Sequence, residues 1–256
     1  MVNRFALEVD IRKTLRSARQ TFHLHARFSV HSRRIVVHGP SGAGKSLLLK
    51  AIAGLVTPDQ GSIVLSGATL FDSAAGTNVS PQERRVAYLF QDYALFPHLT
   101  VRQNVGFGLR RGWINLHGDR PDPAIDAWLE SFELCRVAHQ YPSQISGGQR
   151  QRTALARALV ARPCALLLDE PFAALDPALR SRMRAELHAL HARLEVPMAL
   201  ITHDPEDVRV FGEEVLRLSD GVVEASSATE VLDPPGSYLH PPGHLPGEQR
   251  TEAYRA

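Results

Sequence analysis

Apolar and polar side chains alternate along residues 5–11 and 22–30, as they do in strands that bury one face. A basic connection separates the two segments, so we predict an antiparallel hairpin. Residues 35–37 form a β-branched run that stops at Gly39 and indicates another strand. The same reasoning predicts strands at residues 61–65, 69–71 and 86–90.

Apolar positions at helical spacing dominate other parts of the chain. Residues 46–53 predict a helix that ends at Gly54. Beyond Gln91 the spacing stays mainly helical for about seventy residues, and we predict a helical insertion over residues 92–162. A buried strand at residues 165–168, a helix at 178–194 and a strand at 198–201 are predicted to follow.

This alternation predicts an α/β fold, with a mostly parallel sheet core covered by helices, an antiparallel β edge subdomain and a helical insertion subdomain. Asp176 and Pro177 supply a cap and a first-turn residue for the helix that follows. We assign residues 1–220 to one domain. Residues 221–256 are rich in Pro, Gly, Ser and polar side chains, and we predict a loosely ordered tail there.

Composition excludes several classes of protein. The 256 residues are 44% apolar with a formal charge of +2, a balance too small to favour nucleic acid as a partner. No segment approaches eighteen uncharged apolar residues, so we expect no membrane span and no signal peptide. Cys135 and Cys164 have no companions at metal spacing, and we expect neither a zinc site nor a disulfide.

The strongest chemical signal is a glycine-rich loop between a predicted strand and a predicted helix. Its pattern is that of a phosphate-binding loop, in which backbone N–H groups and the helix start hold phosphates. The lysine would reach the outer phosphates and the last serine would bind Mg²⁺. A chance glycine-rich turn is the alternative. The loop consists of Gly39, Pro40, Ser41, Gly42, Ala43, Gly44, Lys45 and Ser46.

Two carboxylates end the predicted strand at residues 165–168. Asp169 suits a contact to Mg²⁺, and Glu170 suits activation of the attacking water. Acidic residues at strand ends also serve solubility alone, but the upstream glycine loop favours the functional interpretation.

A second anion-binding pattern lies at residues 145–149, before a predicted helix. Its glycines expose backbone donors at a helix start. One chain has little use for two cradles of this kind unless they bind different nucleotides. The residues predicted to contact ATP here are Ser146, Gly147, Gly148 and Gln149.

Together these motifs resemble the ATP-binding cassette ATPases, a family of P-loop NTPases, over residues 5–220. Gln91 resembles the family's Q-loop, residues 174–176 resemble its D-loop, and His203 resembles its switch histidine. The resemblance implies ATP and Mg²⁺ as cofactors and a homodimer with composite ATP sites. It implies that Gln91 contacts the metal, that Asp176 communicates between subunits and that His203 senses the γ-phosphate beside the catalytic Glu170.

The family often places an aromatic side chain against adenine before the phosphate loop, and this chain has none at that position. Arg16 or Arg19 is our alternative for that contact, because an arginine can also stack on a base. Phe22 is aromatic, but its alternation with Leu24 indicates a core position.

Residues 79–109 resemble the importer branch of the family. The resemblance implies integral membrane permease subunits as partners, a solute-binding protein as an indirect one, and a cytoplasmic position at the inner face of the membrane. The N-terminal hairpin and the sequence of residues 70–73 are most similar to those of molybdate uptake subunits, with sulfate, iron and polyamine uptake as alternatives. A soluble cassette ATPase and a module without turnover are competing readings. A permease groove lined by Tyr93, Leu95, Phe96 and Leu99 is expected, with plain packing as the alternative.

Overall fold

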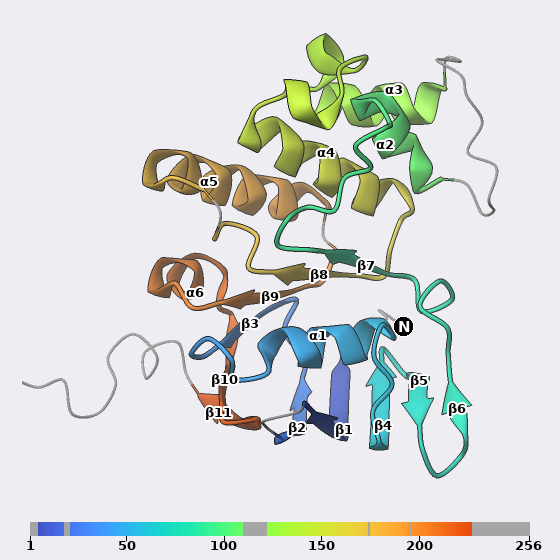
Figure 1. Cartoon of the computed structure of the whole chain (residues 1–256), viewed down its shortest axis with the longest axis vertical. Coiled ribbons are helices and arrows are strands. Elements are labelled where there is room, and N and C mark those ends of the chain that lie inside the picture. The colour runs from blue at the N-terminus through green and yellow to red at the C-terminus, as the bar shows by residue number, and fades with distance from the viewer. Residues whose placement is uncertain (1–4, 18–20, 110–121, 174, 195, 227–256) are drawn as a thin grey trace, which may run out of the picture.

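One twisted sheet organises the computed structural model, which describes residues 5–17, 21–109, 122–173, 175–194 and 196–226 (Figure 1). Within these residues the sheet has eleven strands in the order β6-β5-β4-β1-β2-β11-β10-β3-β9-β8-β7. The strands are β1 (Leu7–Arg16), β2 (Thr21–Val30), β3 (Arg34–His38), β4 (Gln60–Leu65), β5 (Ala68–Asp72), β6 (Thr77–Asn78), β7 (Val86–Leu89), β8 (Ala165–Asp169), β9 (Met198–Thr202), β10 (Glu214–Ser219) and β11 (Val222–Ser226).

The antiparallel end of the sheet contains the predicted hairpin. Strands β1 and β2 pair from Leu7 opposite Val30 to Arg16 opposite Thr21, so the hairpin extends further than the alternation alone indicated. Leu7, Val9 and Ile11 alternate toward the core and are almost fully buried, which fixes the register of the pair.

The other half of the sheet is parallel, which confirms the predicted fold class. Strands β10, β3, β9, β8 and β7 lie side by side in one direction, so their carboxyl ends share one edge. Every residue of β8 and β9 is buried, because helices cover both faces of the sheet here.

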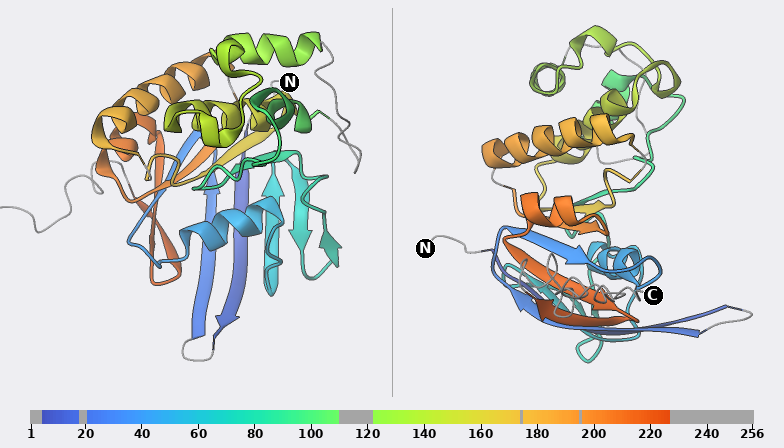
Figure 2. Two further views of the ribbon diagram at one scale, coloured as in Figure 1. Left: turned by 45° about the horizontal axis from the view of Figure 1, so that its top comes forward. Right: turned by 90° about the vertical axis from the view of Figure 1, so that its left-hand side faces the viewer.

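Helices form two layers around this parallel half (Figures 1 and 2). Helix α1 packs with the antiparallel strands in one buried cluster, and the helices after β7 pack in a second cluster on the opposite face. The helices are α1 (Lys45–Ala53), α2 (Val101–Phe107), α3 (Pro123–Ser131), α4 (Gly147–Val160), α5 (Pro177–Leu194) and α6 (Pro205–Phe211), with 3₁₀ turns at Cys135–Val137 and Pro142–Gln144. None of the described helices combines the length and apolarity needed to cross a membrane.

The predicted loose tail is wrong at its beginning, because residues 222–226 form strand β11. Asp220 and Gly221 both have positive φ, 48° and 80°, and make the two-residue turn that Asp-Gly favours between antiparallel strands. Val222 also pairs with His25, which joins the two halves of the sheet. Residues 227–256 lie outside the described residues, so the prediction for that segment stays untested.

Arg84 holds the end of helix α1 and offers a stability test. It is 2% exposed, and its guanidinium donates to the carbonyl oxygens of Ala51 and Ile52, both at 2.8 Å. We expect Arg84→Gln to lower the free energy of unfolding by about 1.5–3 kcal/mol, as for hydrogen bonds from a charged donor.

Arg85→Gln is the matched control, since Arg85 is the exposed neighbour. It should change the free energy of unfolding by no more than about 0.5 kcal/mol. Urea denaturation followed by circular dichroism measures both. Equal stability of the two variants would show that the α1 carbonyls do not depend on this guanidinium.

Candidate functional site

The glycine loop connects β3 to α1 at the carboxyl edge of the parallel strands. Gly42 and Gly44 have φ of 81° and 100°, in the left-handed region that favours glycine. A β-carbon on Gly39 would lie 2.0 Å from the carbonyl oxygen of Leu218, so β10 leaves no space for a side chain. Glycine at these positions therefore follows from backbone geometry and close packing.

Lys45 is 4% exposed and lies inside this loop. Its Nζ donates to the carbonyl oxygens of Gly39 at 2.8 Å and Pro40 at 2.9 Å. The ammonium group also lies 3.7 Å from Oε1 of Glu170. The loop thus places a buried positive charge where the sequence predicts the outer phosphates.

Asp169 at the end of β8 joins the loop to the sheet. The Ser46 hydroxyl donates to Oδ1 of Asp169 at 2.8 Å, and the Tyr88 hydroxyl donates to Oδ2 at 2.6 Å. Burial, the hydrogen bond to Asp169 and the negative charge of Asp169 raise the pKa of Tyr88 far above its usual value, so the phenol remains a donor.

The donor set at Ser46 and Asp169 suits Mg²⁺. Both side chains offer oxygen atoms, which this hard cation prefers, and Mg²⁺ usually takes one or two protein oxygens and fills its remaining positions with phosphate and water. Among the described residues no group of three or more His, Cys, Asp and Glu side chains could hold a metal alone. When bound, Mg²⁺ would neutralise charge on the phosphates.

The carboxylate of Glu170 lies between the ammonium group of Lys45 and the imidazole ring of His203. Its Oε2 is 3.2 Å from Nδ1 of His203, and Lys45 lies on its other oxygen. The side chain of Glu170 is 19% exposed and that of His203 is 58% exposed, so both reach the open edge of the sheet. Glu170 has a φ of 45°, an uncommon conformation for a residue with a side chain.

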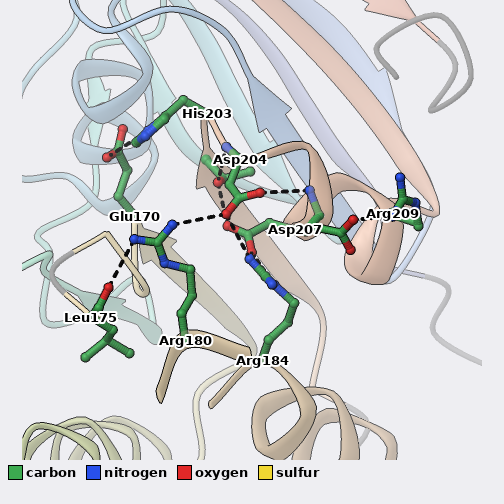
Figure 3. Close-up of polar contacts among 10 residues, drawn as sticks. Glu170, Leu175, Arg180, Arg184, His203, Asp204, Asp207 and Arg209 are labelled. Atoms are coloured by element: carbon green, nitrogen blue, oxygen red, sulfur yellow. Dashed lines mark hydrogen bonds and ion pairs between the residues drawn. The ribbon is translucent and has the colours of Figure 1, made fainter. Parts of the chain in front are cut away.

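A network of arginines and aspartates fixes the segment that follows His203 (Figure 3). Arg184 contacts Oδ1 of Asp207 at 2.6 Å and Oδ2 of Asp204 at 2.9 Å. The guanidinium of Arg180 donates to Oδ2 of Asp204 at 3.4 Å and to the carbonyl oxygen of Leu175 at 3.1 Å. Arg180 thereby connects the predicted D-loop with the predicted switch loop, and Arg184 joins the two aspartates of the switch segment.

Burial raises the pKa of Asp207, and its hydrogen bonds to Thr202 and Arg184 offset only part of that effect. At Asp204 burial acts in the same direction, but the backbone N–H of Glu206 and the guanidinium groups outweigh it and lower the pKa. The two carboxylates therefore differ in their preference for the charged form.

Gln91 and Asp176 lie at exposed positions. Gln91 lies two residues after the end of β7 and two residues before Tyr93, which with Ala94 has a positive φ, 63° and 41°. Asp176 caps α5 as predicted, and its Oδ1 accepts from the N–H of Leu179 at 3.0 Å. Neither side chain makes a hydrogen bond with the glycine loop among the described residues.

The second anion-binding pattern forms the first turn of α4. Ser146 and Gln149 bond reciprocally, with Gln149 accepting from the Ser146 N–H at 2.9 Å and Ser146 accepting from the Gln149 N–H at 3.3 Å. Figure 1 shows α4 and α1 on opposite sides of the sheet. In the described part of the chain, no hydrogen bond or ion pair connects residues 146–149 with residues 39–46.

A cavity of about 860 Å³ lies between the β7 edge and helices α2, α3 and α4. Of the four groove residues predicted from the sequence, Phe96 lines it, while Leu95 and Leu99 are half-buried. Tyr93 is 5% exposed and its hydroxyl donates to the Pro171 carbonyl at 3.2 Å, so plain packing accounts for this residue. Other lining residues include Tyr88, Phe90, Phe107, Trp128 and Arg157.

Sequence reasoning missed Tyr88, Arg180 and Arg184. Tyr88 alternates with Val86 in an apolar strand, and this pattern predicts only a core position. The arginines lie among many others in α5, and nothing in their spacing identifies an aspartate partner. For the adenine contact, Arg16 is exposed at the end of β1, Arg19 lies outside the described residues, and the half-buried ring of Phe22 lies against Gly44.

Comparisons with known proteins place this geometry in a family. Residues 25–173 match the family described as ABC transporter. The sulfate/thiosulfate import ATP-binding protein CysA of Synechocystis sp. is 43% identical over 205 residues, 79% of this chain and 55% of that protein. The CysA protein of Synechococcus elongatus is 42% identical over 219 residues, 83% of this chain and 61% of that protein. The chain thus spans little more than half the length of these relatives.

A solved structure agrees with the sequence matches. The dimeric post-hydrolysis state of the ATP-binding cassette MJ0796, bound to ADP and Pi, superposes with a TM-score of 0.70 at 29% identity and covers 88% of this chain and 98% of that one. The fold and the glycine loop define a P-loop NTPase of the cassette type. The chain belongs to the ABC transporter family.

Arg184 is expected to be essential for the stability of the switch segment. Arg184→Met would leave the carboxylate of Asp207, 4% exposed, without its cation, and breaking such a buried pair costs about 3–5 kcal/mol. Arg182→Met is the control, because Arg182 is 66% exposed. We expect chemical denaturation to show a large loss for the first variant and a change within about 0.5 kcal/mol for the second. Similar losses in both would contradict this assignment.

Proposed function

We propose that this chain hydrolyses ATP as the energising subunit of a membrane importer, with sulfate or thiosulfate as the imported solute. The observation that supports hydrolysis best is the position of Glu170. Its carboxylate lies between Lys45 and His203, at 3.7 Å and 3.2 Å, beside the Ser46 and Asp169 pair. A base, a phosphate-binding cation and metal-binding oxygens thus meet at one edge of the sheet.

Each group has a task in this proposal. The loop from Gly39 to Ser46 binds the phosphates through backbone N–H groups, and Lys45 exchanges its carbonyl partners for phosphate oxygens. Glu170 accepts a proton from the attacking water, and His203 holds the other side of its carboxylate and contacts the γ-phosphate. Gln91 is assigned to the metal or the water, at the entrance to the helical subdomain.

The proposed working form is a homodimer with two composite ATP sites. Residues 146–149 are separated from the chain's own glycine loop and expose backbone donors at the start of α4, where they can contact a nucleotide held by a second copy. The solved cassette of similar fold is described as dimeric and bound to ADP and Pi, which supports this arrangement. Asp176 would lie between the two copies.

The proposed membrane partner is a permease subunit that binds in the 860 Å³ cavity. Aromatic side chains and the aliphatic wall of α4 suit the apolar face of a short helix. A solute-binding protein would act through the permease, and the cassette would work at the cytoplasmic face of the membrane. We do not propose a nucleic acid as a partner.

The proposed solute is sulfate or thiosulfate, in place of the molybdate that the sequence resemblance favoured. The relatives described above have the sulfate/thiosulfate name, at 42–43% identity, and none of them has a molybdate name. Sulfate was among the alternatives, and it is also a tetrahedral oxyanion. The cassette itself does not bind the solute in this proposal, so specificity belongs to the permease and the solute-binding protein.

Glu170→Gln tests hydrolysis. We expect ATP binding to persist, because the loop contacts remain, and steady-state turnover to fall by about 100-fold or more through loss of the base. Glu224→Gln is the control, since Glu224 is exposed on β11 and, among the described residues, its side chain makes no hydrogen bond or ion pair with the site. Phosphate release and nucleotide titration measure the two effects. Unchanged turnover in Glu170→Gln would refute the catalytic role.

The composite site is tested by placing two substitutions, Lys45→Ala and Ser146→Arg, either in different chains or in the same chain of a heterodimer. In a Glu170→Gln background, a heterodimer with Lys45→Ala in one chain and Ser146→Arg in the other keeps one undamaged composite site, so we expect it to retain about half the ATP of the parent dimer. A heterodimer with both substitutions in the same chain damages both composite sites and should retain none. Sites confined to single chains would reverse the two results, as measured by radiolabelled ATP on purified heterodimers.

A further inference from the structure

Both oxygens of Asp169 have a defined hydrogen-bond donor. Ser46 donates to Oδ1 at 2.8 Å and Tyr88 donates to Oδ2 at 2.6 Å. Asp169 as a whole is 6% exposed, so bulk water has little access to this residue. Tyr88 is not among the residues that sequence motifs single out, and the proposed hydrolysis does not use it.

The sheet register explains how Tyr88 reaches this carboxylate. Tyr88 of β7 pairs with Leu167 of the parallel strand β8, and Asp169 is two residues further along β8. Alternate residues of a strand project from the same face, so Tyr88, Leu167 and Asp169 share the face that α1 covers. Ser46 reaches the carboxylate from α1 on that same face.

We propose that Tyr88 is a positioning residue that orients the Asp169 carboxylate for the Mg²⁺ that accompanies ATP. By holding Oδ2, the phenol directs Oδ1 toward Ser46, so the two predicted metal-binding oxygens face each other before nucleotide binds. This inference rests on the proposed ATP site and adds a residue to it.

Orientation of this kind matters for magnesium in particular. Mg²⁺ requires nearly ideal octahedral geometry, so rotation of one carboxylate weakens the site. Loss of a hydrogen-bond partner of a metal ligand typically reduces metal affinity by about 10–100-fold. The ring of Tyr88 is held independently of its hydroxyl, because it packs against the ring of Phe90, with the two centroids 4.6 Å apart, and against the buried cluster that contains α1. Removing the hydroxyl therefore leaves the packing intact.

Tyr88→Phe tests the proposal with a binding measurement. The affinity of the chain for a fluorescent ATP analogue is titrated against Mg²⁺ and measured again with EDTA. We expect the Mg²⁺ concentration at half-maximal enhancement to rise by about 10-fold or more, with binding in EDTA unchanged. Tyr93→Phe is the matched control, because it also loses a hydrogen-bonded phenol hydroxyl, one bonded to Pro171 and not to Asp169.

Three outcomes decide the question. An unchanged Mg²⁺ midpoint in Tyr88→Phe overturns the proposal, and so does a loss of binding that is equal in Mg²⁺ and EDTA, which would show a structural effect. A shift of the same size in Tyr93→Phe overturns it as well. Thermal unfolding without nucleotide should give the same midpoint for both variants, which confirms that each is folded during the titration.

The steady-state rate separates this proposal from the proposed function. If the parent hydrolyses ATP, Tyr88→Phe should need more Mg²⁺ for half-maximal rate and recover most of the maximal rate at high Mg²⁺. A parent chain that binds ATP without turnover would refute the proposed hydrolysis, yet the binding titration would still decide whether Tyr88 positions Asp169.

Discussion

The hydrogen bond from Ser46 to Asp169 joins two segments that lie 123 residues apart in the chain. It forms because β3 and β8 run parallel on either side of β9, so the loop after β3 and the carboxylate at the end of β8 meet at one edge. The remaining groups of the site depend on this meeting. Lys45 and Glu170 are direct neighbours in sequence of the two bonded residues, and His203 directly follows the strand between them.

Much of this arrangement could be predicted from sequence. Strands buried on both faces, such as β8, give continuous apolar runs, and the glycine loop has its own backbone requirements at Gly42 and Gly44. Strands β10 and β11 were missed, although Asp220 and Gly221 are a recognisable hairpin turn. The polar composition beyond that turn obscured a five-residue strand whose stability comes from β10 and β2.

Other parts of the site could not be predicted because they depend on partners that only the fold brings together. Tyr88 occupies an apolar alternation, and its hydroxyl acquires a role only through the register of β7 on β8. Arg180 and Arg184 depend on the packing of α5 against α6, which places aspartates of the switch segment within reach. A sequence motif identifies residues that touch the nucleotide, whereas these residues touch other residues.

Helix α4 extends the same reasoning to motion. Its first turn presents Ser146 for the proposed contact with a second copy, and Arg157 in its last turn donates to the carbonyl oxygens of Tyr93 and Ala94, both at 2.7 Å. Those two residues have positive φ, so the guanidinium stabilises a backbone conformation that costs free energy. A rigid-body displacement of α4 would therefore move Arg157 and, through its hydrogen bonds, the carbonyl groups of Tyr93 and Ala94 that follow Gln91. The direct packing of α4 against α2, α3 and β7 would carry the same displacement to the wall of the cavity.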